Sequence, residues 1–459
     1  MNVRELPLDC EPWSLFRVLA SKERPFFIDA GQPWGGEWVS CMGFRPRMQF
    51  RVTAAEAPDA PLATLDALLA AAPPALRTAA RRRAVPFAGG VVVALAYEAR
   101  HASEPAAPVP GEAADAPRLA GGVYDWALAY DHRRRRWRLA SWHCDARALA
   151  AIAAEIDEAA AAAARGPRTL VLPVQAAAVT AGLDAEAYAA RVARIQEYIA
   201  AGDAYQVNLT DRFETRLPAP AVDVYGRLRA AQAVPFGAYI DLGPERVLSV
   251  SPELFLRRRG ERVTTCPIKG TRPRGATAAA DAAFAADLVR DPKERAEHVM
   301  IVDLERNDLG RVCRTGSVAV ERLAARVPFA TVQHLVSTVS GRLRPGVAAS
   351  DLLRATFPSG SITGAPKIRA MEIIAEIEGA PRGFYTGAVG WIDASGDCDL
   401  NVAIRTAVAR GDTLAYHAGG GIVADSRADR EYAELQLKAA AFFRALGAGG
   451  GAAAQRALR

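Results

Sequence analysis

The chain has 459 residues, of which 51% are hydrophobic and 24% are charged, with 37 Gly and 29 Pro. This composition excludes a wholly disordered or collagen-like chain, and the length allows about two or three domains of ordinary size. The formal net charge of +6 suits a small anionic substrate, but it is too diffuse to indicate binding to nucleic acid.

Targeting features and cysteines predict a protein of the cytoplasm. No apolar run is long enough to span a bilayer, and residues 1–13 lack the apolar core of a signal peptide, so we expect no membrane partner. Six cysteines, none of them in a CxxC pair, are too few for a disulfide scaffold. A reducing cytoplasm is the location that these features favour.

The first part of the chain, residues 1–165, mixes strand-like runs with expected loops. The run Arg133–Arg136 joins two of the strands, and a solvated turn is favoured over a nucleic-acid patch because no other basic cluster accompanies it. An Ala-rich helix is expected over 146–164. The expected strands are 91–97, 124–130 and 137–142, and the expected Ala/Pro-rich surface loops are 54–80 and 102–120.

In the second part, residues 183–446, capping and turn residues separate the predicted elements regularly. Asp184 is expected to cap a helix that ends at Gly202, and residues 205–213 alternate as a strand. Runs of strands without strict βαβ alternation indicate an α+β fold with large antiparallel sheets. We expect a flexible tail over 447–459. Further strands are predicted at 236–241, 246–250, 262–268, 331–341, 384–392, 400–408 and 413–418, and further helices at 278–290, 293–307, 349–357, 366–379 and 428–446.

Lysine is rare in this chain. Only five of the 57 basic residues are Lys, and four of them lie between positions 269 and 438. Because Lys can lose its proton whereas Arg effectively never does, chemical roles are favoured for some of these lysines. Lys269 closes a predicted strand, and it could act as a nucleophile if burial or a nearby cation lowers its pKa. The alternative is an ordinary lysine at the end of a strand.

Two carboxylate pairs lie on predicted helices. Glu294 and Glu297 are three residues apart, as are Glu431 and Glu434, so each pair shares a helix face. Two such faces brought together would suit Mg²⁺, which takes one or two carboxylates and keeps positions for water and an anionic substrate. The alternative, which spacing alone favours, is that Glu434 pairs with Lys438 on the surface and Glu294 caps its helix.

Glycine-rich segments offer candidate anion sites. Residues 357–367, FPSGSITGAPK, open a helix whose backbone N–H groups could hold a carboxylate or phosphate, but the GKS or GKT of a nucleotide-binding loop is absent. The run Gly419–Gly421 would let backbone amides approach an anion, or it forms a tight turn. Arg405 stands in a predicted buried strand, where a charge requires an anionic partner.

Together these stretches resemble the chorismate-utilising enzymes, which include anthranilate, aminodeoxychorismate, isochorismate and salicylate synthases. The resemblance implies one α+β core with two large antiparallel sheets interleaved from both parts of the chain, helices on the outside, and dependence on Mg²⁺. The matching stretches are GDAYQVNLTDRF (202–213), SPELF (251–255), PIKGTRPRG (267–275), KERAEHVMIVDLERNDLGRV (293–312), VQHLVSTVSG (332–341), FPSGSITGAPKIRAMEII (357–374), GFYTGAVG (383–390), NVAIRT (401–406), AGGGIVADS (418–426) and EYAELQLKA (431–439).

The resemblance also implies roles for individual residues. It places Glu297 and Glu434 at the magnesium ligands, with Glu294 and Glu431 supporting them, and it suggests a tryptophan pocket for which residues 235–239 are lining candidates. One chorismate carboxylate is expected at Arg405 and Tyr385, beside the backbone of Gly419 and Gly421. Thr271, Ser361 and Lys438 are expected near the other carboxylate and the metal. His334 is expected near the ring hydroxyl, as a catalytic residue.

Two positions distinguish the branches of this family. Isochorismate and salicylate synthases carry a water-activating Lys where this chain has Gln206, and Gln takes no proton at neutral pH. Anthranilate synthases carry Ala at the position of Lys269, whereas the aminodeoxychorismate synthase branch carries PIKGT, as here. The resemblance thus implies amination of chorismate at C4 to 4-amino-4-deoxychorismate, for 4-aminobenzoate and folate biosynthesis, with anthranilate synthase component I as the alternative.

The implied mechanism is covalent. Lys269 attacks C2 of the ring, Glu253 is the expected general acid for the departing C4 hydroxyl, and ammonia then adds at C4. The chain shows no G-x-C-x-G nucleophile turn, so a separate glutamine amidotransferase is expected to supply the ammonia. A catalytically silent, anion-binding homologue is the rival of another class.

Overall fold

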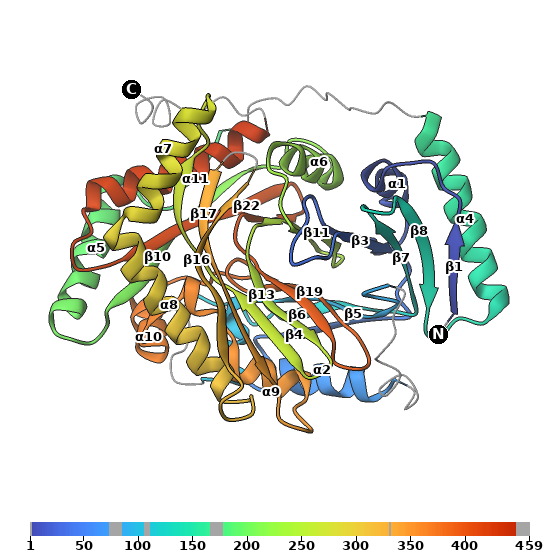
Figure 1. Cartoon of the computed structure of the whole chain (residues 1–459), viewed down its shortest axis with the longest axis horizontal. Coiled ribbons are helices and arrows are strands. Elements are labelled where there is room, and N and C mark those ends of the chain that lie inside the picture. The colour runs from blue at the N-terminus through green and yellow to red at the C-terminus, as the bar shows by residue number, and fades with distance from the viewer. Residues whose placement is uncertain (1, 73–84, 105–110, 166–177, 330–331, 447–459) are drawn as a thin grey trace.

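The computed structural model describes residues 2–72, 85–104, 111–165, 178–329 and 332–446. Within these ranges the chain forms two large antiparallel sheets covered by helices (Figure 1). The predicted tail lies outside the described residues, as does most of the stretch that joins the two parts of the chain. No helix in the described ranges combines the length and the apolar character needed to cross a bilayer.

The first sheet combines five strands from the first part of the chain with six from the second, and one short strand, β9, from the stretch between them. This interleaving, which the resemblance implied, is confirmed. In sheet order the strands are β1 (Asn2–Leu6), β8 (Arg136–Ser141), β7 (Trp126–Asp131), β3 (Val39–Gly43), β2 (Phe26–Asp29), β11 (Phe236–Asp241), β12 (Glu245–Ser251), β21 (Thr406–Arg410), β22 (Thr413–Ile422), β10 (Gln206–Arg216) and β18 (Gly364–Ala365), with β9 (Thr180–Ala181) also paired to β10.

The second sheet is interleaved in the same way, because three of its strands come from the first part of the chain. In sheet order the strands are β15 (Ile268–Pro273), β17 (Val332–Arg342), β14 (Arg262–Cys266), β13 (Leu254–Arg259), β20 (Cys398–Val402), β19 (Ala388–Ile392), β5 (Gly90–Leu95), β6 (Pro117–Tyr124) and β4 (Met48–Thr53), with β16 (Ala319–Pro328) also paired to β17.

The helices lie on the outside of the sheets, and in Figure 1 α5, α7, α8, α10 and α11 gather at the end opposite α1 and α4. Helix α5 begins as expected, because the Asp184 side chain accepts a hydrogen bond from Ala187 N at 2.8 Å. The helices are α1 (Pro12–Leu19), α2 (Ala60–Ala70), α4 (Ala146–Arg165), α5 (Ala185–Ala200), α6 (Ala221–Ala231), α7 (Ala278–Arg290), α8 (Pro292–Gly310), α9 (Ala349–Thr356), α10 (Lys367–Glu378) and α11 (Ala428–Ala445), with short 3-10 turns η1 (Tyr97–Ala102) and η2 (Gly360–Ile362).

An aromatic cluster packs the two sheets together. Phe26 of β2 in the first sheet lies edge-on to Tyr124 of β6 in the second, with ring centroids 4.6 Å apart. Phe87 contacts Phe26 and also Trp391 of β19, the latter at 5.0 Å. All four side chains are buried. The interface between the sheets at this cluster is therefore apolar.

Three expectations about elements were wrong. Residues 60–70, inside a stretch expected to be loop, form α2, whose Leu62, Leu65 and Leu68 are buried. The predicted strand 262–268 is interrupted between β14 and β15. The predicted strand 400–408 is two strands in different sheets, and the chain crosses from β20 to β21 through Arg405, whose φ is +49°.

Candidate active site

The predicted site residues come from six elements that meet at one end of the molecule. Helix α8 packs against β15 and β17, and helix α11 packs against β22, which pairs with β10. In Figure 1 these two helices and the strands β17 and β22 lie in the same half of the molecule. The site is therefore built from strands of both sheets, β15 and β17 of the second and β22 of the first, and its two helices bring carboxylates to it.

Lys269 stands where β15 departs from regular pairing. The register with β17 shifts between Lys269 and Thr271, and Gly270 between them has a φ of +67°. A Cβ at Gly270 would lie 2.7 Å from Leu288 and 3.2 Å from a Glu294 oxygen, so both the conformation and the space require glycine there. The kink sets Lys269 apart from the regular strand residues around it.

The environment of Lys269 lowers the pKa of its amine. Desolvation is the main cause, and the positive charge of Lys438 acts in the same direction, while the charges of Glu297 and Glu253 partly oppose both. In the part of the chain that the structure describes, no carboxylate forms an ion pair with Lys269 Nζ. A neutral amine has the free electron pair that a nucleophile needs.

Glu253 lies in the connection between β12 and β13 and is buried. Burial raises its pKa to about 8, and the charge of Glu305 adds to the increase, while hydrogen bonds with the Ser361 side chain and the Ile268 N–H and the charge of Lys269 oppose it. Its Oε1 atom has no hydrogen-bond partner among the described residues. A carboxyl group that is protonated at neutral pH suits a general acid.

His334 connects the two sides of the site. Its Nδ1 atom lies 2.8 Å from the Gly270 carbonyl oxygen, which only accepts, so Nδ1 carries the proton. Its Nε2 atom therefore accepts the hydrogen bond from Arg405 Nη2 at 3.2 Å. Burial, the largest cause, and the charge of Arg405 lower the pKa of His334 to about 3, so the ring is neutral. Thr271 Oγ1 also lies 3.2 Å from Nδ1.

Arg405 is half-buried and has no carboxylate partner among the described residues. Burial lowers the pKa of Arg405, but a guanidinium stays charged in proteins even when it is buried. Among the described residues, neutral His334 is the one side chain that hydrogen-bonds to Arg405. A desolvated cation with such a partner forms a receptor for an anion. Tyr385, which the resemblance placed beside Arg405, stacks instead on His417 with ring centroids 5.0 Å apart.

The glycines of β22 are not a turn, so that alternative is wrong. Gly419 and Gly421 pair with β10, and a Cβ at either would clash, at 2.6 Å with Leu209 O and at 2.7 Å with the Gln206 amide respectively. The absence of a side chain at Gly419 and Gly421 is therefore a requirement of the packing. Lys438 Nζ donates to Gly419 O at 2.7 Å, which joins α11 to this strand.

The four carboxylates on α8 and α11 share one electrostatic environment. Burial raises the pKa of Glu297, with the charges of Glu294 and Glu431 adding to it, and burial likewise raises the pKa of Glu431. The expected pair of Glu434 with Lys438 is present at 2.8 Å. Glu294 does not cap α8, because that cap is the side chain of Asp291.

This donor set fits a magnesium ion. The charges of Glu294 and Glu431 raise the pKa of Glu297, and a cation beside these carboxylates would relieve that repulsion. Oxygen ligands are those that Mg²⁺ prefers. Among the described residues no three His, Cys, Asp or Glu side chains form a ready-made metal centre. One or two carboxylates completed by water and substrate oxygens would match that arrangement.

The sequence reasoning missed Glu305, a buried carboxylate behind Ser361. Its Oε1 accepts from Ser359 Oγ and from Gly360 N, both at 2.9 Å. It lies eleven residues after Glu294, close to three full helical turns, so helical periodicity would have placed both on one face of α8. Lys367, at the end of the glycine-rich segment 357–367, is a structural residue. It pairs with Asp308 and donates hydrogen bonds to two backbone carbonyl groups.

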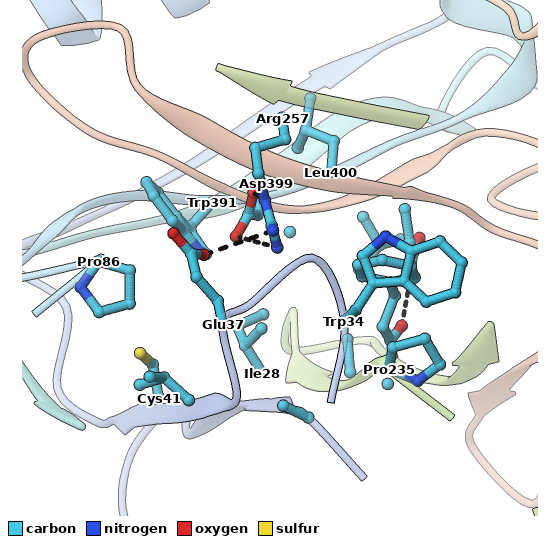
Figure 2. Close-up of a pocket in the computed structure, with 18 of the residues that line it drawn as sticks. Ile28, Trp34, Glu37, Cys41, Pro86, Pro235, Arg257, Trp391, Asp399 and Leu400 are labelled. Atoms are coloured by element: carbon cyan, nitrogen blue, oxygen red, sulfur yellow. Dashed lines mark hydrogen bonds and ion pairs between the residues drawn. The ribbon is translucent and has the colours of Figure 1, made fainter. Parts of the chain in front are cut away.

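A separate pocket lies between the sheets, where the tryptophan pocket was expected (Figure 2). Pro235 and Phe236 line it, as expected, and its charged residues pair with one another, since Arg257 lies 2.7 Å from Asp399 and 3.5 Å from Glu37. Its volume of about 50 Å³ is room for a water or two. Binding of tryptophan here stays a prediction.

Comparison with known proteins gives concordant results. Residues 23–444 match the family model described as chorismate binding enzyme. Aminodeoxychorismate synthase component 1 of Klebsiella aerogenes is 42% identical over 350 residues, 76% of this chain and 75% of that protein. Anthranilate synthase component 1 of Streptomyces coelicolor is 43% identical over 378 residues, 79% of this chain and 73% of that protein.

The same likeness holds in three dimensions. The crystal structure of anthranilate synthase component I from Streptococcus pneumoniae TIGR4 matches with a TM-score of 0.78 at 30% identity, covering 90% of this chain and 93% of that one. The identities to the two kinds of synthase are nearly equal, so overall similarity does not separate them. The distinction has to come from residues in the site.

Proposed function

This chain belongs to the family of chorismate binding enzymes, and from that premise we propose that it aminates chorismate at C4 to give 4-amino-4-deoxychorismate. The observation that carries the proposal is Lys269, an amine with a lowered pKa and no carboxylate partner among the described residues, near the raised-pKa acid Glu253. A charged structural lysine would instead be ion-paired. The product feeds 4-aminobenzoate and folate synthesis, and we place the reaction in the cytoplasm, which the free cysteines suit.

The charges of the site support a dianionic substrate. Arg405 binds one carboxylate of chorismate, together with backbone groups of Gly419 and Gly421. Thr271 and Ser361 contact the other end of the substrate. Neutral His334 holds the guanidinium in place and presents no competing charge to the ring.

The reaction then proceeds in two balanced steps. Nζ of Lys269 forms a bond to C2, the ring double bonds shift, the C4–O bond breaks, and the Glu253 proton converts the departing hydroxyl to water. Ammonia next forms a bond to C4, the double bonds shift back, and the Nζ–C2 bond breaks. The surplus proton on the new amine returns to the Glu253 carboxylate, and Lys269 leaves as a neutral amine.

Magnesium is part of this proposal. Glu297 and Glu434 would hold the ion with Glu294 and Glu431 in support, where it would neutralise substrate charge and stabilise the departing oxygen. We expect dialysis against EDTA to abolish chorismate consumption and added Mg²⁺ to restore it. The Glu297→Gln variant should need roughly 10- to 100-fold more Mg²⁺ for half-maximal rate. Glu186→Gln, an exposed change on α5, is the control, and an unchanged Mg²⁺ requirement in Glu297→Gln would contradict the ligand assignment.

Ammonia requires a partner in this proposal. We infer a separate glutamine amidotransferase that hydrolyses glutamine and passes ammonia to the site. With glutamine as the only nitrogen source, the chain alone should not aminate chorismate, whereas ammonium salts should support the reaction.

The alternative function is that of anthranilate synthase component I, which the likeness to the Streptomyces coelicolor protein favours. The test is product identity after incubation with chorismate, Mg²⁺ and ammonium, followed by chromatography and mass spectrometry. We expect 4-amino-4-deoxychorismate, which keeps its enolpyruvyl group and is not fluorescent anthranilate. Prompt anthranilate fluorescence would reject C4 amination, and no chorismate consumption at all would favour the silent homologue.

A further inference from the structure

Two buried carboxyl groups are joined by a pair of serine hydroxyls. The Ser361 side chain hydrogen-bonds to Glu253, and its Oγ lies 3.1 Å from Ser359 Oγ. Ser359 Oγ lies 2.9 Å from Glu305 Oε1. The two glutamates are 2% and 1% exposed, so bulk water does not interrupt this chain of three hydrogen bonds.

Counting protons on this chain gives a constraint. Each of the three hydrogen bonds needs one hydrogen, and the two serine hydroxyls supply two. The third must come from a carboxyl group, so all three bonds form only when one of the two glutamates is protonated. Backbone N–H groups act at both ends, Gly360 N at Glu305 Oε1 (2.9 Å) and the Ile268 N–H at Glu253, so they do not separate the two ends. When Ser359 donates to Glu305, the negative charge lies on Glu305 and the proton on Glu253.

The charged groups around the chain favour the same arrangement. Glu305 faces Lys367 of α10 and Asp308 on its own helix, and Lys367 forms its ion pair with Asp308. Asp308 also lies 3.6 Å from Arg311. At the other end, Glu253 faces Lys269, whose positive charge is disfavoured by desolvation. The stronger cationic environment is therefore at the Glu305 end, where it stabilises the carboxylate.

We propose that Glu305 is a positioning residue that shares one proton with Glu253 through the Ser359 and Ser361 hydroxyls and so keeps Glu253 in its acid form. The inference rests on the proposed function, because it assigns Glu305 an effect on the acid of that reaction. Glu305 itself does not touch the substrate.

The shared proton also explains how Glu253 is reset. When Glu253 gives its proton to the departing oxygen, both carboxyls are ionised and one of the three hydrogen bonds lacks a hydrogen. That state is unfavourable because two negative charges and an unmade bond are buried together. Glu253 therefore takes up the proton that the new C4 amine releases, and the original chain is restored with no net gain or loss of protons.

The test is the pH profile of the Glu305→Gln variant, measured as chorismate consumption with ammonium as nitrogen source. Glutamine keeps the acceptor for Ser359 and Gly360 but removes the negative charge. Loss of a nearby like charge lowers the pKa of Glu253, so the alkaline limb of the profile should move down by roughly one pH unit. Asp303→Asn, an exposed charge change on the same helix, should leave the limb in place.

A lower rate with an unmoved alkaline limb would mean that Glu305 is only structural, and it would overturn the inference. The Ser359 variants test the bridge: Ser359→Ala should lower the rate by roughly 10-fold, and Ser359→Thr, which keeps the hydroxyl, should restore it. Equal rates in Ser359→Ala and wild type would also overturn the inference.

A substrate-free readout separates this inference from the proposed function. In infrared difference spectra, the buried carboxylic-acid C=O band should persist to near pH 8 in the wild type and vanish at lower pH in Glu305→Gln. Bands that titrate alike in the two proteins would reject the shared proton, whatever product the enzyme makes. An enzyme that consumes no chorismate at any pH, with bands that differ as expected, would instead reject the proposed function alone.

Discussion

Replacing Lys269 by alanine should lower C4 amination of chorismate by roughly 10³-fold or more, even with ammonia in excess. Without the amine no bond forms at C2, so the ring double bonds have no covalent route by which to expel the C4 hydroxyl. The measurement is the initial rate of 4-amino-4-deoxychorismate formation at saturating Mg²⁺. Chorismate affinity should change little, because the other carboxylate-binding groups remain.

Two further variants make this test specific. Lys269→Arg keeps a positive charge but never a free amine, so it should be as inactive as the alanine variant. Lys22→Ala removes another of the five lysines, one whose partner is the surface residue Glu155, and should keep the wild-type rate. Wild-type amination by Lys269→Ala would reject the covalent step, and activity in Lys269→Arg would reduce the lysine to an electrostatic role.

Much of the fold could be predicted because local signals and burial agree. The bounds expected for 236–241 and 278–290 are those of β11 and α7, where periodicity and turn residues give the same result. Helix α2 was missed because its Ala/Pro-rich sequence looks like a loop. Its leucines are buried because α9, η1 and the strands β4, β5 and β6 pack against it, which is tertiary information.

The site shows the limit of local reasoning more sharply. The alternation of side-chain types along the sequence predicted a single strand over 400–408 that contains Arg405. The chain instead leaves one sheet for the other at this residue, and the positive φ breaks the alternation. Arg405 thus reaches His334 across the site because it is not in a strand. Glu305 was overlooked because its partners Ser359 and Gly360 are more than fifty positions away, and only the folded chain brings them together.

Both the sequence spacing and the folded structure were needed to interpret the carboxylate pairs. Spacing showed that Glu294 shares a face with Glu297, and Glu431 with Glu434, but it favoured surface and capping roles. The structure supports part of each reading, because Glu434 does pair with Lys438 while the charge of Glu431 on α11 raises the pKa of Glu297 on α8. Sequence spacing cannot indicate that α8 and α11 face each other.

Replacing Glu253 by glutamine should lower the amination rate by roughly 10²- to 10⁴-fold, because the amide cannot give a proton to the departing C4 hydroxyl. The wild-type profile carries the signature of this acid. Burial raises the pKa of Glu253 to about 8, and only the protonated form is active, so the rate should fall as the pH rises through that value. Lys269 acts as the neutral amine, so the rate should also fall as the pH drops below the lysine's lowered pKa.

These two limbs give a bell-shaped dependence of kcat/KM on pH, and each belongs to one residue. In Glu253→Gln the alkaline limb should disappear while the acid limb stays, because the lysine is unchanged and only the general acid is lost. Glu261→Gln, an exposed change at the turn between β13 and β14, should keep both limbs and the wild-type rate. An alkaline limb that survives in Glu253→Gln would show that another group protonates the leaving oxygen, and the Glu253–Glu305 pair would then have no part in the reaction.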